Sequence, residues 1–207
     1  MKLLHVDSSI LGADSASRRL TQAVVDRFAR ADPGLEVVRR DLAAEPLAHL
    51  SGALLAAARG GATEVDEAVA RDLARDRQAL AEFLAADVVV IGAPMYNFTV
   101  PTQLKAWLDR LAVAGTTFKY TAEGAVGLVR GKRVVVVSTR GGVYAEGGPD
   151  FQEPYLRAFF AFLGVTDLEV VRAEGLALGP APRQRALDEA AARVAALATD
   201  AAGAVAA

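Results

Sequence analysis

Three segments of this chain concentrate hydroxyl, aromatic, amide and glycine residues, and each of them follows a short apolar run. They are the serine-rich segment 7–17, the segment 92–101 with its aromatic residues and prolines, and the segment 138–144 with its paired glycines. Hydroxyl groups and the free amides of a helix start can bind a phosphate. Aromatic and methionine side chains can face a flat ring, and glycines let a backbone pack against its edge. Together the segments suit a ligand with a phosphate and a planar ring.

The serine-rich segment leads into an expected helix and carries Ser9, Ser15 and Ser17. It has one glycine, Gly12, so it matches neither the G-x-G-x-x-G fingerprint nor a Walker A loop. Serine hydroxyls at a helix start suit a single phosphate monoester better than a pyrophosphate, which needs close approach of the backbone. The alternative is that Ser15 or Ser17 is simply the N-cap of the helix.

The other two segments suit the ring of such a ligand. Met95, Tyr96 and Phe98 can pack against a flat ring, while Asn97 and backbone amides bond to its polar edge. The alternative is a turn filled by ordinary hydrophobic residues. In the third segment the paired glycines at 141–142 allow edge-on packing of the backbone, or they serve a turn that needs positive φ.

Five apolar runs alternate with helical patterns, which indicates a three-layer α/β/α sandwich around a parallel sheet. The runs are 3–6, 35–38, 88–91, 134–137 and 168–171. Continuous apolar runs are typical of strands covered on both faces, so the two mixed runs, 35–38 and 168–171, are expected at the sheet edges. Strand order 2-1-3-4-5 is favoured. This order brings the three segments to the carboxyl ends of strands around the topological switch point, where ligands bind.

Apolar residues at helical spacing predict the helices that flank this sheet. The predicted helices are 17–31, 66–85, 101–111 with Pro101 at the first helical position, 151–163 ended by Gly164, and 183–198. The charged residues at 66–77, Asp76 among them, indicate a solvated helix face. The stretch 41–86 breaks near Gly60-Gly61 into two helical pieces. The stretch 115–132 suggests an aromatic hairpin, which is either a lid or subunit contact or a surface excursion without a role.

The amino-acid composition limits the chemistry that this chain can perform and the partners that it can bind. The chain has no cysteine and two histidines, which excludes thiolate chemistry and leaves little for a metal site, so we expect no metal. A net charge of −2 gives no general attraction for nucleic acid or an anionic membrane. No apolar run approaches the ~20 residues of a membrane span, and the start is too polar for a signal peptide, so we expect a cytoplasmic protein. We expect one domain over 1–200 and a fraying alanine-rich tail at 201–207. His5 is expected to be a packing residue, and His49 receives no role.

At this point the sequence resembles a known family. The segment Ala93-Pro94-Met95-Tyr96-Asn97-Phe98 with Gln103-Leu104-Lys105 closely resembles the FMN-dependent NADH:azoreductases, also called NADH:quinone oxidoreductases. Further matches are Ser8-Ser9-Ile10, Arg40-Asp41-Leu42, Phe118-Lys119-Tyr120-Thr121, Arg140-Gly141-Gly142 and Ala173-Glu174-Gly175. The resemblance runs from the first strand to about Gly179, nearly the whole chain.

The resemblance implies a flavodoxin-like fold and a homodimer with tightly bound, non-covalent FMN near the subunit interface. It implies a ping-pong reaction in which NADH reduces FMN and the flavin then reduces a quinone or an azo compound. It also implies site roles. Ser9 and Ser15-Ala16-Ser17 hold the phosphate, Met95-Tyr96-Asn97-Phe98 line the isoalloxazine and ribityl groups, and Thr139-Arg140-Gly141-Gly142 meet the pyrimidine end of the ring.

The chemistry is then carried by FMN, and no side chain is expected to be an indispensable catalytic nucleophile. Phe118 and Tyr120 are expected to help form the pocket of the second substrate, from the neighbouring subunit. The main alternative is a flavodoxin-like electron carrier that has FMN but no substrate of its own. Two others are a quinone reductase that uses FAD and a phospho-receiver module, although Gly92-Ala93-Pro94 stands where a receiver needs an aspartate.

Overall fold

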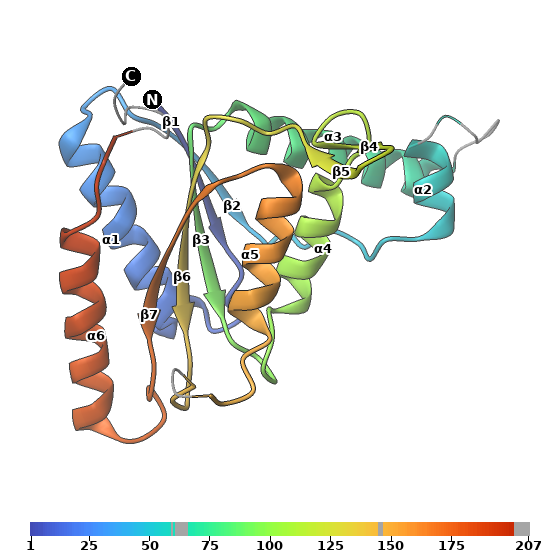
Figure 1. Ribbon diagram of the computed structural model, residues 1–207. Coiled ribbons are helices and arrows are strands. Elements are labelled where there is room, and N and C mark those ends of the chain that lie inside the picture. The colour runs from blue at the N-terminus through green and yellow to red at the C-terminus, as the bar shows by residue number, and fades with distance from the viewer. Residues whose placement is uncertain (59, 61–65, 145–146, 201–207) are drawn as a thin grey trace.

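The computed structural model describes residues 1–58, 60, 66–144 and 147–200, and a five-stranded parallel sheet lies at its centre (Figure 1). The strands are β1 (Lys2–Asp7), β2 (Glu36–Asp41), β3 (Val88–Pro94), β6 (Arg133–Thr139) and β7 (Asp167–Ala173), in the order β2-β1-β3-β6-β7. Because β4 and β5 form a separate hairpin, this is the predicted order 2-1-3-4-5. The predicted fold class is therefore confirmed.

The burial of the strands follows their place in the sheet. Every residue of β3 and β6 is buried, as expected for strands covered on both faces. Most of β2 is exposed or half-buried, and so is much of β7. The edge positions predicted for the two mixed runs are confirmed. In register, Val88 of β3 lies between Leu3 of β1 and Arg133 of β6, so the central strands end together at one edge.

Helices cover both faces of the sheet. One face packs on α1 (Ala16–Ala31) and α6 (Pro180–Ala195), and the other packs on α3 (Glu67–Ala85), α4 (Thr102–Leu111) and α5 (Gln152–Leu163) (Figure 1). The short helices are η1 (Gly12–Asp14), a single 3₁₀ turn, and α2 (Gly52–Ala58), which lies beside α3. None of the helices in these ranges is long and apolar enough to cross a membrane.

Each layer of helices buries its own apolar cluster. Between the sheet and α3, α4 and α5, the ring of Phe83 lies 6.2 Å from Trp107 in an edge-on contact and 6.3 Å from Phe160. On the opposite face Val24 and Phe28 of α1 are fully buried. Both clusters hold the ends of the strands in place, so the loops that follow them start from fixed positions.

Two details of the helices correct the predictions, and a third confirms one. Pro101 is the N-cap of α4 and the helix begins at Thr102, since the ψ of Pro101 is 145°, an extended value. Helix α6 begins at Pro180, earlier than the predicted 183, because proline suits the first turn of a helix. Gly164 ends α5 in the left-handed conformation with φ 100°, as predicted.

The prediction of a solvated charged face on α3 is wrong for one residue, Asp76. Asp76 Oδ1 lies 3.0 Å from Nε of Arg110, a side chain only 2% exposed, so Asp76 belongs to a largely buried ion pair. Burial raises the pKa of the Asp76 carboxyl above its ordinary value, and Arg110 opposes that rise. Periodicity cannot show such a pair because the two residues lie on different helices. Gly61 and the tail 201–207 fall outside the described residues.

The predicted aromatic hairpin is present as β4 (Phe118–Thr121) and β5 (Gly124–Gly127), which pair antiparallel. Its Phe118 ring lies 4.5 Å from the ring of Phe162, near the end of α5. Figure 1 shows the hairpin at the end of the sheet where the strands begin, away from their carboxyl ends. The hairpin therefore lies opposite the edge at which we predicted the ligand.

Lys132 gives a pH-dependent prediction. Its buried Nζ donates to the carbonyl of Ala86 and lies 5.0 Å above the ring of Phe83. Burial lowers the pKa of Lys132 from its ordinary 10.5 to about 8. Between these values the folded protein binds fewer protons than the unfolded chain, so stability should rise with pH. Relative to Lys132→Met, we expect the free energy of unfolding to gain about 1–2 kcal/mol across this window, measured by urea titration.

The matched control is Lys105→Met. Lys105 is 48% exposed and pairs with Asp109 on the surface of α4. Its stability curve should run parallel to that of the wild type between pH 8 and 10.5. If the Lys132→Met curve also runs parallel, the ammonium of Lys132 is not desolvated in the folded protein.

Candidate functional site

The three segments predicted from sequence meet at the carboxyl edge of the sheet. Ser9 Oγ, after β1, lies 3.4 Å from the phenol oxygen of Tyr96, after β3. The amide of Met95 donates to the carbonyl of Thr139, at the end of β6, over 2.8 Å. Because each loop bonds to the next, residues far apart in sequence form one continuous rim.

The amino end of α1 is the polar end of this rim. Ser15 is the N-cap, and its Oγ accepts from the amide of Arg18 over 3.2 Å, so the N-cap alternative is correct for Ser15. Its Oγ also lies 3.0 Å from Oγ of Ser17. The amides of Ala16 and Ser17 donate to no residue in the described ranges. Free amides at the start of a helix of 16 residues form a ready anion site.

A network of ion pairs and hydrogen bonds holds the loop between β1 and α1 in place. Arg18 donates to both carboxylate oxygens of Asp41, over 2.6 and 2.7 Å, and to the carbonyl of Ser9 over 2.9 Å. The hydrogen bond from Arg18 lowers the pKa of the Asp41 carboxyl. Sequence reasoning missed the role of Arg18, although Arg40-Asp41-Leu42 was among the matched motifs. The arginine thus ties the loop between β1 and α1 to the end of β2.

Gly92 lets β3 pass close to that loop. A Cβ at this position would lie 2.9 Å from Oδ1 of Asp7 and 3.2 Å from Cγ2 of Thr21. Thr21 Oγ1 donates to the same carboxylate over 2.9 Å. His5 is buried beside it, with Nε2 3.2 Å from the other oxygen of Asp7, which agrees with the packing role expected for His5. Close packing of β1, β3 and α1 thus leaves no room for a side chain at residue 92.

The second segment forms a strained turn. Tyr96 and Thr99 exchange two backbone hydrogen bonds of 3.0 and 3.2 Å, and the residues between them, Asn97 and Phe98, have φ of 48° and 71°. This is the geometry of a type I′ turn, which usually needs Gly or Asn at these positions. Such strain in residues other than glycine is concentrated at functional sites.

The strained turn presents its side chains to the outside. Phe98 is 45% exposed, and Asn97 forms no side-chain hydrogen bond with any described residue. The carbonyl of Phe98 accepts from the amide of Phe151 over 3.0 Å, and its ring meets Tyr144 edge-on at 6.3 Å. The exposed Phe98 ring is therefore open to another molecule, and its packing against a flat ring stays a prediction.

The third segment supplies hydrogen-bond donors. The carbonyls of residues 140–142 accept from the amides of residues 175–177 over 2.8–3.0 Å, so they point away from the rim. The amides of Gly141 and Gly142 have no partner among the described residues. Neither glycine has a positive φ, so the alternative of a positive-φ turn is wrong. A Cβ on Gly142 would lie 3.2 Å from the ring of Tyr144, and this close approach explains the glycine.

The Arg140 side chain does not reach the rim. Its guanidinium is 1% exposed, with Nη1 2.9 Å from Glu174 Oε1 and Nη2 2.7 Å from Asp150 Oδ2. Its Nε donates to Ser138 Oγ over 3.0 Å. The side chain of Arg140 is therefore not placed to meet a ligand, and its backbone amide and carbonyl bond to Ala173 and Leu176. Sequence reasoning missed this cluster, for which Ala173-Glu174-Gly175 was the available signal.

Phe118 and Tyr120 are not brought to the rim of their own chain. Phe151, just before α5, bonds to the strained turn, whereas Gly164, at the end of α5, contacts the hairpin. The 12 residues of α5 span about 18 Å between these points. Tyr120 is 76% exposed and Phe118 is buried, so only Tyr120 offers its ring to another molecule.

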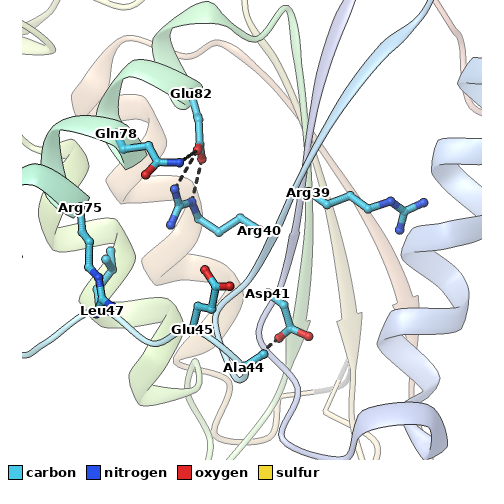
Figure 2. A pocket seen from close by; sticks show the side chains of 9 residues that line it. All are labelled: Arg39, Arg40, Asp41, Ala44, Glu45, Leu47, Arg75, Gln78 and Glu82. Carbon is cyan, nitrogen blue, oxygen red and sulfur yellow. Dashed lines mark hydrogen bonds and ion pairs between the residues drawn. The ribbon is translucent and has the colours of Figure 1, made fainter.

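A separate polar pocket of about 300 Å³ lies beside β2 (Figure 2). Its most buried charge, Arg40, is paired with Glu82 through two bonds of 2.7 and 2.8 Å, and Gln78 donates to the same carboxylate over 2.8 Å. None of the residues predicted for the site lines this pocket. It therefore contributes nothing to the candidate site.

Comparison with known proteins places the chain in a family. The sequence model of a family described as having a flavodoxin-like fold matches residues 1–198. The chain belongs to this flavodoxin-like family. Within it, an FMN-dependent NADH:quinone oxidoreductase from Methylocella silvestris is 55% identical over 92% of this chain and 95% of its own length. An FMN-dependent NADH:quinone oxidoreductase 1 from Pseudomonas putida is 57% identical over 94% of this chain and 97% of its own.

Solved structures of the flavodoxin-like family agree with the sequence relatives. An azoreductase from Bacillus anthracis superimposes with a TM-score of 0.82 at 32% identity, covering 95% of this chain and all of the other. An FMN-dependent NADH-azoreductase from the same species, solved in complex with FMN, has a TM-score of 0.83 at 26% identity, with 94% and 98% covered. The resemblance to NADH:quinone oxidoreductases and azoreductases is confirmed.

Proposed function

We propose that this protein is an FMN-dependent oxidoreductase that passes two electrons from NADH to quinones and aromatic azo compounds by a ping-pong mechanism, cleaving the azo bond reductively. One observation carries the proposal. Free amides at the start of α1 and at Gly141-Gly142 face one rim, with an exposed aromatic turn between them. The names of the close relatives support the general reaction. The use of NADH fits the expected cytoplasmic location.

The residues of the rim fit FMN from end to end. The Ser9 and Ser15 hydroxyls and the Ala16-Ser17 amides would hold the phosphate at the positive end of α1. Met95-Tyr96-Asn97-Phe98 would line the ring and the ribityl chain. Thr139 and the free amides of Gly141 and Gly142 would meet the pyrimidine edge, where amides favour negative charge. The flavin itself supplies the hydride chemistry.

The donor amides of the rim give a direct prediction about affinity. Gly142→Val should place a side chain against Tyr144 and turn its amide away, and Asn97→Ala should remove the exposed amide of the turn. A hydrogen bond to the neutral oxidised ring contributes about 0.5–1.5 kcal/mol, so we expect FMN affinity to fall about two- to tenfold in fluorescence titrations. Gly52→Val is the control, because Gly52 faces open space. Unchanged FMN binding in both rim variants would exclude this placement.

A stripe of aromatic residues on α5 supports the homodimer. Phe151, Tyr155, Phe159 and Phe162 recur at helical spacing, Phe151 is 64% exposed, and the other three are half-buried. A two-fold axis perpendicular to α5 would pair such stripes in opposite directions. The hairpin at the end of α5 in one protomer would then lie beside the rim at the start of α5 in its partner. This arrangement gives Tyr120 a place in the partner's second-substrate pocket.

Tyr120→Ala tests that arrangement. Removing an exposed ring that faces only the second substrate should raise KM for quinones about tenfold and leave KM for NADH nearly unchanged. Phe118→Ala is a poorer test because Phe118 is buried against Phe162. Val126→Ala is the control, since Val126 lies on the other face of the same hairpin. Equal changes in both KM values would argue against a role in the acceptor pocket.

The reaction itself is tested by the visible spectrum of the FMN-loaded protein. NADH alone should bleach the flavin bands, and benzoquinone should restore them. Under anaerobic conditions an azo dye should lose its colour and give aromatic amines. A flavodoxin-like electron carrier would not be bleached rapidly by NADH, and FAD in the released cofactor would indicate the other kind of quinone reductase.

A further inference from the structure

A cluster of charged side chains lies beside the segment 140–142, and all but Arg157 and Arg172 are buried or half-buried. Its members are the cations Arg140, Arg157 and Arg172 and the anions Asp150, Glu153 and Glu174. Three positive and three negative groups balance one another. Arg140 lies between two carboxylates that come from different loops, at 2.7 and 2.9 Å. The cluster therefore ties the loop after β6 to the start of α5 and to the loop after β7.

Glu174 has a special place in this cluster. Its Oε1 accepts from Nη1 of Arg140 over 2.9 Å and from the backbone amide of Tyr144 over 3.2 Å. Arg140 and Tyr144 flank Gly141 and Gly142, so one carboxylate oxygen connects both ends of the segment 140–144. Glu174 bonds to neither donor amide itself.

The backbone fixes the same segment from below. The amides of residues 175–177, directly after Glu174, donate to the carbonyls of residues 140–142. With the carbonyls held on one side and the ends joined by the carboxylate, the two glycine peptides have little freedom to rotate. Their amides must then point to the rim. Glycine is the residue most in need of such restraint because it is the most flexible.

We propose that Glu174 is a positioning residue for the flavin and that it acts by aiming the amides of Gly141 and Gly142. The inference rests on the proposed function. Amides held in place before the reaction stabilise the negative charge of the reduced ring more than they stabilise the neutral oxidised ring. Glu174 should therefore raise the affinity for reduced FMN relative to oxidised FMN without contacting either.

A purely electrostatic role would have the opposite sign. Removing the Glu174 carboxylate leaves extra positive charge on Arg140, and positive charge favours the reduced flavin. Misdirected amides would thus lower the midpoint potential of the bound flavin, whereas loss of the carboxylate charge would raise it. Glu174→Gln removes the charge and keeps an oxygen that can accept from Arg140 and Tyr144, so it separates the two effects.

The experiment compares midpoint potentials of FMN-loaded Glu174→Ala, Glu174→Gln and a control. In Glu174→Ala we expect reduced FMN to bind about tenfold more weakly relative to oxidised FMN, a fall of about 30 mV for a two-electron couple. Glu174→Gln keeps the hydrogen bonds and loses the charge, so its potential should lie at or above that of the wild type. The control is Glu169→Ala on β7, the strand that precedes Glu174. Glu169 accepts from the buried Arg133 over 3.0 Å but touches no rim loop, so its loss should lower the melting temperature and leave the potential unchanged.

Each other outcome overturns the proposal. A potential that rises in both Glu174 variants assigns the effect to charge, and an unchanged potential in Glu174→Ala removes the role altogether. A shift of equal size in Glu169→Ala shows general loosening of the sheet. If Glu174→Ala does not fold, a fall in potential in Glu174→Gln as large as that expected for alanine overturns it. If the wild type binds no FMN, the proposed function fails. Hydrogen exchange of the Tyr144 amide in the ligand-free protein then decides whether the carboxylate holds the segment 140–144. We expect this exchange to be faster in Glu174→Ala than in the wild type.

Discussion

Replacing Ser17 by aspartate should weaken FMN binding at least a hundredfold and leave the binding of riboflavin, which has no phosphate, nearly unchanged. Ser17 is buried at the start of α1 beside free amides, so a carboxylate there would occupy the anion site itself. Two like charges within about 4 Å at the edge of a protein repel by about 4 kcal/mol. Fluorescence titrations with the two flavins give the ratio of affinities directly.

Two controls accompany this prediction: the FMN affinity of Ser17→Ala and the melting temperature of ligand-free Ser17→Asp. Ser17→Ala removes one hydroxyl and should cost only a few-fold in FMN affinity. An aspartate in the first turn favours the helix dipole, so the ligand-free variant should melt no lower than the wild type. Equal loss of FMN and riboflavin in Ser17→Asp would show that the phosphate binds elsewhere.

Gly127→Ala should be the most damaging small substitution in the hairpin. A Cβ there would lie 2.2 Å from the amide nitrogen of Gly164 and 2.3 Å from the carbonyl carbon of Leu163. Both contacts are with backbone, so no side chain can rotate to relieve them, and β5 must separate from α5. We expect the free energy of unfolding to fall by about 2–4 kcal/mol in urea titrations.

The separation of β5 from α5 should also reach the reaction. The Phe118–Phe162 contact would open and Tyr120 would lose its fixed position, so KM for quinones should rise while FMN affinity stays the same. Gly52→Ala, at an open position with nothing within 4 Å, should behave like the wild type. A Gly127→Ala protein with normal stability would mean that β5 does not pack closely on the end of α5.

The sheet could be predicted because the residue types in its strands follow how deeply each strand is buried. The runs Val88–Ile91 and Val134–Val137 have no polar residue, as central strands between two layers of helices require. The mixed runs 35–38 and 168–171 form the edge strands, because an edge strand is less buried and can carry polar residues. Boundaries were less accurate where proline decides them, since Pro101 caps α4 from outside while Pro180 begins α6.

The site was predictable in its location but only partly in its geometry. Strand order alone brings the three segments to one edge. The left-handed conformation of Asn97 and Phe98 was not expected, because a phenylalanine there is unfavourable without the bonds that hold the turn. The burial of Arg140 was missed as well, because its partners Asp150 and Glu174 come together only when β6, β7 and α5 are packed.

The charges on the outer strands limit how copies of this chain can join. Strand β2 carries Glu36, Arg39 and Arg40, and β7 carries Asp167 and Arg172. Ionic side chains along a border strand oppose the addition of another strand from a neighbouring molecule. Neither border of the sheet is suited to growth into a larger β-structure. Self-association is therefore directed to helical surfaces and to the hairpin, and continuous ribbons of stacked subunits are disfavoured.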